Sequence, residues 1–215
     1  MITIGIIGAG EVGTHLARAA IASGYTVVIA NSRGPETLAG LVDQLGPAAR
    51  AAAAADAAMA GDFVVIAVPL KLVNDMPVDA LAGKIVIDTN NYMPWRDGSY
   101  LVVDSGEKTE HELRQEQLPA SKVVKAFTHI QAPRILTWGR PAGSPDRIAL
   151  SASSDFPEAV AVVARLYDQF GFDTVDNSPL RESWRTRPGQ PAWKQSAQTR
   201  SQLVANLASA SRLGR

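Results

Sequence analysis

The chain has 215 residues, 46% of them hydrophobic, and its 21 basic and 21 acidic side chains give a formal net charge of zero. This length can bury a core in one domain, or in one domain with an appendage. The balanced charge lacks the basic excess that binds nucleic acid or an anionic membrane, so we expect neither as a partner. The sequence has no cysteine, which excludes disulfides, thiolate nucleophiles and cysteine metal sites. We predict no metal.

The N-terminal residues are typical of a strand and lack the basic region and cleavage signal of a secretory leader. The apolar runs are also too short to span a bilayer. These features predict a cytoplasmic protein.

A strand, a tight turn and a helix are predicted in that order at the start of the chain. The apolar run from Ile2 to Ile7 ends in Gly-Ala-Gly-Glu-Val-Gly at residues 8–13, a helical pattern follows from Glu11, and Gly24 is placed to end that helix. A second apolar run, residues 25–30, completes a strand–helix–strand unit. This context makes the glycine pattern indicate a dinucleotide site.

Each glycine of the turn has a predicted physical role. Gly8 permits the turn, Gly10 lets the backbone approach a pyrophosphate, and Gly13 lets helix and strand pack closely. The pyrophosphate would lie against the backbone N–H groups at the helix start, where the helix dipole favours an anion. Because a carboxylate there would repel it, we expect the side chain of Glu11 to point into solvent.

The residues after the second strand indicate which nucleotide binds. An NAD enzyme usually has Asp or Glu here for the ribose 2′-hydroxyl, but this chain has Asn31, Ser32 and Arg33. Ser32 can donate to a 2′-phosphate, and Arg33 can pair with it and lie against the adenine. The three residues predict NADP as the cofactor. The alternative is a plain polar turn before a helix near Pro35.

Strands and helices continue to alternate along the chain. Further strands are predicted within residues 49–53, 62–68, 84–88, 122–127, 146–152 and 172–175, and a helix over 156–170, capped by Asp155 and ended by Gly171. The fold class is therefore α/β: a Rossmann-like, doubly wound, mostly parallel sheet with a small C-terminal α/β extension. We expect an NADP-binding domain at 1–120, a portion completing the acceptor site at 121–190, and a frayed tail or partner-docking helix at 191–215.

Ligands of such sheets bind beyond the carboxyl ends of the strands. Val68, Pro69, Asn90 and Asn91 follow two strands and are expected at the cofactor site, although Pro69 is as well explained as a strand terminator. A third strand runs into Thr128-His129, so His129 is the one histidine with a credible substrate-contacting position. His15 is expected to be structural. His111 falls in a charged segment, 106–117, that predicts a surface helix, where it would be solvated.

Five motifs give the sequence a family resemblance. They are Gly-Ile-Ile-Gly-Ala-Gly-Glu-Val-Gly, Asn-Ser-Arg-Gly, Ile-Asp-Thr-Asn-Asn-Tyr, Val-Val-Lys-Ala-Phe and Gly-Arg-Pro-Ala-Gly-Ser-Pro-Asp-Arg, in that order. The chain resembles the NADPH:coenzyme F420 oxidoreductase family over roughly residues 1–191. The resemblance implies a homodimer that reversibly moves a hydride between NADP and the deazaflavin coenzyme F420.

The resemblance also implies site residues. The 2′-phosphate would lie on Ser32 and Arg33, with Asn31 beside them. The pyrophosphate would lie on the turn, on the backbone of Gly10, Glu11 and Val12 between Gly8 and Gly13. The nicotinamide would lie near Val68, Pro69 and Ala126, with the acceptor over it, near Asn90, Thr128 and His129. Relatives commonly have Asn-Thr or His-Thr where this chain has Thr128-His129, so this chain departs from the family pattern in the loop that would face the acceptor.

We find no nucleophile or acid/base triad in the sequence, and name no catalytic residue. Hydride transfer between two cofactors needs none, because the protein supplies mainly stacking and orientation. Three hypotheses remain: a reductase of F420 or a flavin-like acceptor; an NADP-dependent reductase of a carbonyl, an imine or ferric iron; and a non-catalytic NADP-binding regulatory protein.

Overall fold

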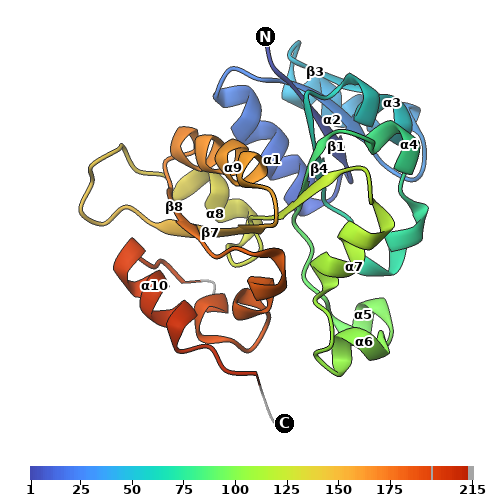
Figure 1. Cartoon of the computed structure of the whole chain (residues 1–215). Helices are drawn as coiled ribbons and strands as arrows, with labels where there is room; N and C mark the ends of the chain where they lie inside the picture. Colours follow the sequence, from blue (N-terminus) through green and yellow to red (C-terminus); the bar gives the residue numbers. More distant parts are fainter. Residues whose placement is uncertain (195, 213–215) are drawn as a thin grey trace.

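The computed structural model describes residues 1–194 and 196–212, and within them eight strands form one sheet in the order β3-β2-β1-β4-β5-β6-β7-β8 (Figure 1). Every neighbouring pair is parallel except β6 and β7. This confirms the predicted α/β, Rossmann-like, mostly parallel sheet. The strands are β1 (Thr3–Ile7), β2 (Thr26–Ala30), β3 (Ala49–Ala51), β4 (Phe63–Ile66), β5 (Ile85–Asp88), β6 (Lys122–Lys125), β7 (Ala149–Ser154) and β8 (Asp173–Asp176).

Helices connect the strands and cover both faces of the sheet. The α-helices are α1 (Glu11–Ala22), α2 (Ala39–Leu45), α3 (Ala54–Ala60), α4 (Val78–Leu81), α5 (Pro94–Asp97), α6 (Leu101–Asp104), α7 (Glu110–Gln117), α8 (Ala132–Thr137), α9 (Pro157–Gln169) and α10 (Arg200–Ala208). Four 3₁₀ helices are described: η1 (Pro35–Leu38), η2 (Leu70–Asp75), η3 (Leu180–Thr186) and η4 (Pro191–Trp193). Among the described residues, no helix combines the length and apolar character needed to cross a membrane.

The strands alternate their side chains between two apolar cores. Phe63 and Val65 of β4 pack on the face that includes residues of α1 and α9, whereas Val64 and Ile66 pack on the opposite face. Burial on both faces explains why these strands are nearly continuous β-branched runs. The first core extends over residues of both α1 and α9, so the C-terminal portion shares a core with the N-terminal half.

Glycine makes room for α3 against the middle of the sheet. A Cβ at Gly5 would lie 2.2 Å from the carbonyl oxygen of Ala57, and one at Gly61 would lie 2.6 Å from the nitrogen of Gly5. The alanine-rich stretch obscured the third strand in the sequence, but small side chains are what this close packing requires. The expected short strand followed by a helical turn is confirmed as β3 and α3.

The C-terminal portion corrects one prediction and completes another. The side chain of Asp155 does not cap α9; its Oδ1 accepts from the backbone nitrogen of Leu180 at 2.9 Å, while Phe156 is the N-cap. Helix α10 is not frayed, because Leu203 and Leu207 pack with Ala149 and Val175 of the sheet. Docking of α10 on a partner stays a prediction, as do the domain boundaries. Leu213, an apolar residue of the predicted tail, lies outside the described residues.

The charged segment 106–117 is not a solvated surface helix. Helix α7 begins at Glu110 after a Thr109–Glu112 capping box, and the side chains of Glu110, His111 and Arg114 are fully buried. The prediction that His111 is solvated is therefore wrong. The buried face of this helix carries Glu110 and Arg114, which have opposite charges. An ordinary amphipathic helix would have an apolar stripe there.

We predict that Gly5→Ala lowers the free energy of unfolding by about 3 kcal/mol, because the added methyl group clashes with the α3 backbone. Gly40→Ala is the matched control: this exposed glycine of α2 leaves open space where a Cβ would lie, with no non-local heavy atom within 4 Å, so alanine should stabilise by about 0.5–1 kcal/mol. Urea unfolding measures both. Equal stability of Gly5→Ala and wild type would refute this account of the packing.

Candidate active site

The turn between β1 and α1 depends on glycine at two positions. Gly8 has φ 116°, and a Cβ there would lie 2.4 Å from the carbonyl oxygen of Ala67. A Cβ at Gly13 would lie 1.8 Å from the carbonyl oxygen of Gly8. The first glycine therefore allows both the backbone conformation and contact with the end of β4, and the second lets α1 start against the turn.

The start of α1 has room and donors for an anion. Gly10 is the N-cap, no side chain caps the helix, and a Cβ at this position would have no non-local heavy atom within 4 Å. The first backbone N–H groups of a helix have no partner within the helix, so those of Glu11, Val12 and Gly13 are suited to a pyrophosphate. The side chain of Glu11 is exposed, as expected.

The loop after β2 is held by Asn31. Its Oδ1 accepts from the backbone nitrogen of Arg33 at 3.0 Å, and its Nδ2 donates to Oγ1 of Thr37 at 2.9 Å. Ser32 and Arg33 are exposed, and their side chains make no hydrogen bond or ion pair with any other described residue. Asn31 thus braces the loop, while Ser32 and Arg33 keep the donors predicted for a 2′-phosphate.

The residues after β4 and β5 lie at the same edge of the sheet. Val68 and Pro69 are half-buried. Pro69 lies between β4 and η2 as the N-cap of η2, which agrees with its alternative interpretation as a strand terminator. Asn90 is buried; its Oδ1 accepts from Nη2 of Arg96 at 3.2 Å, and its Nδ2 has no partner among the described residues. Asn91 donates through Nδ2 to the carbonyl oxygen of Thr128 at 2.7 Å, which joins the β5 and β6 loops.

The loop after β6 is buried and strained. Ala126 and Thr128 are buried, and Phe127 between them has φ 58°, a left-handed conformation that costs free energy for a bulky residue. The backbone nitrogen of Phe127 donates to the hydroxyl of Tyr167 at 2.9 Å, and the two rings pack edge to face with centroids 4.8 Å apart. Tyr167 therefore holds the loop that was predicted to face the acceptor.

His129 is neutral and bonded to β7. Its Nε2 lies 2.9 Å from the backbone nitrogen of Ser151, which can only donate, so Nε2 is the acceptor. Burial, followed by the positive charge of Lys125, lowers the pKa of His129 from 6.5 to about 4. This ring nitrogen is therefore not available to a substrate, and acceptor contact by Asn90, Thr128 and His129 stays a prediction.

A buried ion cluster, which the sequence analysis missed, lies behind this edge. Nε of Arg187 donates to Glu110 Oε2 at 2.9 Å, and Nζ of Lys125 lies 3.6 Å from Glu110 Oε1 and donates to the carbonyl oxygen of Ser183 at 2.9 Å. Beside it, Nε of Arg114 donates to Oδ2 of Asp88 at 3.2 Å. Lys125 and Asp88 are the last residues of β6 and β5, so the cluster fixes α7 and η3 against the edge.

Electrostatics keep Glu110 charged at neutral pH. Burial alone would raise the pKa of this carboxyl group, but the charges of Lys125 and Arg187, joined by that of His111 once its ring is protonated at low pH, outweigh burial and lower it to about 2. Burial lowers the pKa of Lys125 to about 8, against the opposing effect of Glu110. The signal in the sequence was the charge itself: Lys125 stands between the apolar pairs at 123–124 and 126–127.

Comparisons with known proteins agree with this geometry. Residues 3–92 match the family model described as "NADP oxidoreductase coenzyme F420-dependent". The crystal structure of hypothetical protein SMa0349 from Sinorhizobium meliloti superposes with a TM-score of 0.79 at 30% identity, over 93% of this chain and 96% of that one. A protein from Arthrobacter sp. FB24 with the provisional name of F420-dependent NADP reductase gives 0.73 at 27% identity, over 85% and 87% of the two chains. The chain belongs to the coenzyme F420-dependent NADP oxidoreductase family.

Membership of this family of NADP-dependent oxidoreductases supports NADP as the cofactor. Another relative is the metalloreductase STEAP3 of Rattus norvegicus, 29% identical over 185 residues. That match includes 82% of this chain but 34% of the relative, so the chain spans about a third of its length.

We predict that the free energy of unfolding falls as the pH falls from about 6.5 to about 4. Burial lowers the pKa of both His111 and His129 to about 4, so between these values the unfolded chain binds protons that the folded chain does not. At pH 5 each histidine should cost about 2 kcal/mol relative to neutral pH.

The measurement is urea unfolding at pH 7 and pH 5. His129→Gln keeps an acceptor for Ser151 and should remove about half of the loss, whereas the control His15→Gln, at a half-buried position of α1, should leave it unchanged. An unchanged pH dependence in His129→Gln would contradict the assignment of a neutral buried imidazole.

Proposed function

We propose that the protein transfers a hydride from NADPH to a deazaflavin of the coenzyme F420 type or to a flavin-like acceptor. The observation that supports this most is the pairing of an uncapped α1 start with the exposed Ser32 and Arg33 at one sheet edge. These groups fit the pyrophosphate and the 2′-phosphate of NADP. The family description names the same cofactor and acceptor class.

The reaction assigns positioning, not proton transfer, to the chain. When bound, NADPH supplies the hydride from its nicotinamide ring. The backbone of Gly10, Glu11 and Val12 would hold the pyrophosphate, and Val68 and Pro69 would support the nicotinamide. Ala126 is fully buried, so it would not touch that ring but would support the residues that do. Holding the reacting carbons roughly 3–3.5 Å apart in a site with little water supplies much of the acceleration.

The environments of two titratable side chains, His129 and Lys125, support this assignment. A carbonyl reductase needs a group that delivers a proton to the substrate oxygen. His129 is buried with Nε2 bonded to Ser151, and Lys125 is 2% exposed and donates to Ser183. Neither presents a proton at the surface of the site. A deazaflavin or flavin acceptor needs no such residue in the hydride step.

Ferric iron is the second candidate acceptor, because one relative is named a metalloreductase. We propose further that the protein is a cytoplasmic homodimer, as the family resemblance implies. The three-part division of the chain at residues 120 and 190 also belongs to this proposal.

Stopped-flow mixing of the NADPH-loaded protein with F420, flavin mononucleotide or a ferric chelate tests the proposal. We expect F420 to oxidise NADPH at a rate on the order of 1 s⁻¹ or faster, flavin more slowly, and NADH to be a poor donor with every acceptor. Faster reduction of the ferric chelate than of either flavin would favour the second candidate. NADPH oxidation by none of the three would contradict both.

A further inference from the structure

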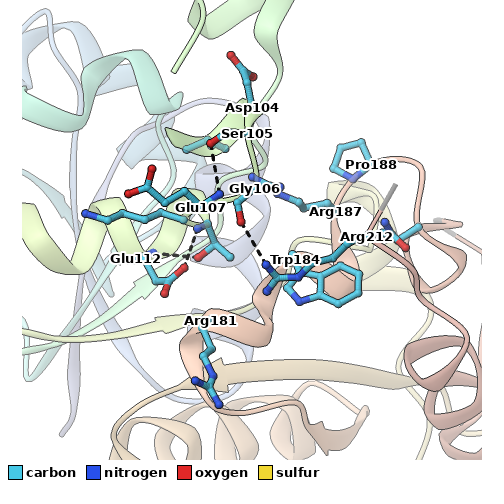
Figure 2. A pocket seen from close by; sticks show the side chains of 14 residues that line it. Asp104, Ser105, Gly106, Glu107, Glu112, Arg181, Trp184, Arg187, Pro188 and Arg212 are labelled. Carbon is cyan, nitrogen blue, oxygen red and sulfur yellow. Dashed lines mark hydrogen bonds between the residues drawn. The ribbon is translucent and has the colours of Figure 1, made fainter. Parts of the chain in front are cut away.

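A cavity of about 730 Å³ lies beside the candidate site, between the α6–α7 connection and the C-terminal segments. One wall comes from residues 103–109 and Glu112, and the other from η3, the loop after it and Arg212. Figure 2 shows Arg212 reaching the carbonyl of Gly106 on the opposite wall, and the hydrogen bond between them is 3.1 Å. No step of the proposed hydride transfer uses this cavity.

The two walls differ in charge. The wall from the C-terminal segments carries Arg181, Arg187 and Arg212 and no carboxylate. The opposite wall carries Asp104, Glu107 and Glu112, and two of these carboxylates accept hydrogen bonds from nearby residues. Asp104 accepts from the hydroxyl of Tyr92 at 2.7 Å, and Glu112 accepts from the backbone nitrogen of Thr109 at 2.7 Å. An anion would therefore lie along the arginine wall.

The arginines of this wall retain donors. Arg187 uses Nε on Glu110, and its buried Nη2 has no partner among the described residues. Arg181 is exposed, and its side chain makes no hydrogen bond or ion pair within the described chain. Arg212 lies over the ring of Trp184 at 5.1 Å and uses Nη1 on Gly106, leaving the other donors of its guanidinium. Planar guanidinium groups bind phosphate and carboxylate through paired hydrogen bonds.

Glu110 connects this cavity to the sheet edge. Its two carboxylate oxygens contact Arg187, which lines the cavity, and Lys125, which ends β6. The residue after Lys125 is Ala126, predicted near the nicotinamide. This buried ion pair thus lies between Arg187 of the cavity and the end of β6, at the edge where the reactive ring of a ligand is expected.

We infer that the cavity binds the acidic side chain of the hydride acceptor, with Arg181, Arg187 and Arg212 pairing with its phosphate and carboxylate groups. The inference rests on the proposed function and makes it more specific. Coenzyme F420 carries a phosphodiester and glutamyl carboxylates on a flexible chain attached to the deazaflavin. Its bare deazaflavin, which lacks those groups, has the same reactive ring.

The test compares F420 with this bare deazaflavin on NADP-loaded protein. Equilibrium binding is followed by tryptophan fluorescence, and turnover by NADPH oxidation, for the wild type, Arg181→Ala, and the double variant Arg181→Ala with Arg212→Ala. Arg165→Ala is the matched control, because this exposed arginine of α9 does not line the cavity. Thermal unfolding checks that each variant is folded.

We expect Arg181→Ala to raise the Kd of F420 about three- to tenfold, with a larger rise in the double variant and no change for the bare deazaflavin or for Arg165→Ala. Equal affinity of the wild type for the two deazaflavins, or equal effects of the variants on both, would overturn the inference. Selective F420 binding without NADPH oxidation would refute the proposed function and support the cavity assignment. Turnover of both deazaflavins at rates that do not change in the arginine variants would support the proposed function and refute the cavity assignment.

Discussion

The close backbone contacts made by Gly5, Gly8 and Gly13 determine where everything else at the candidate site can lie. At each position a single added carbon would come within 2.4 Å of a carbonyl oxygen of another segment. These contacts bring α3 against β1, the turn against the end of β4, and the first turn of α1 against the sheet. The result is a helix start with uncapped N–H groups at the carboxyl edge of the sheet, which is where an anion is stabilised without a basic side chain.

The other side of the edge is held by charge. Burying Glu110, Lys125, Asp88 and Arg114 costs desolvation, and the pairs among them and with Arg187 offset much of that cost. Loss of one partner would leave an uncompensated buried charge, which makes this arrangement specific. The cluster fixes α7 and η3 against the ends of β5 and β6. Through Arg187 it also places the arginine wall beside the site.

The strands and helices of the N-terminal half could be predicted from the sequence because their signals are local. The turn glycines, the β-branched strands and the loop at residues 31–33 each follow from backbone sterics or strand burial within a short segment. The errors came from contacts distant in sequence. Glu110, next to His111, pairs with Lys125 of β6 and with Arg187 after η3, and Asp155 binds the backbone of Leu180 instead of capping its own helix. No periodicity of a single helix contains that information.

The same difference between local signals and contacts distant in sequence explains which features of the site could be predicted. Ser32 and Arg33 could be proposed as contacts of the 2′-phosphate because the residue types of a single loop carry the argument. The commitment of His129 Nε2 to Ser151 and the left-handed Phe127 depend on β7 and α9, which lie more than 20 residues along the chain. The arginine wall combines Arg181 of η3 and Arg187 just after it with Arg212 near the end of the chain, so no motif marks it.

The central proposal is that Arg33 selects NADP by pairing with the 2′-phosphate. Calorimetric titration of NADP and of NAD into the wild type and into Arg33→Ala tests it most directly. A charge-assisted contact predicts a loss of about 1.5–3 kcal/mol in binding free energy for NADP and almost none for NAD. Equal losses for the two nucleotides, or no loss for either, would contradict the claim.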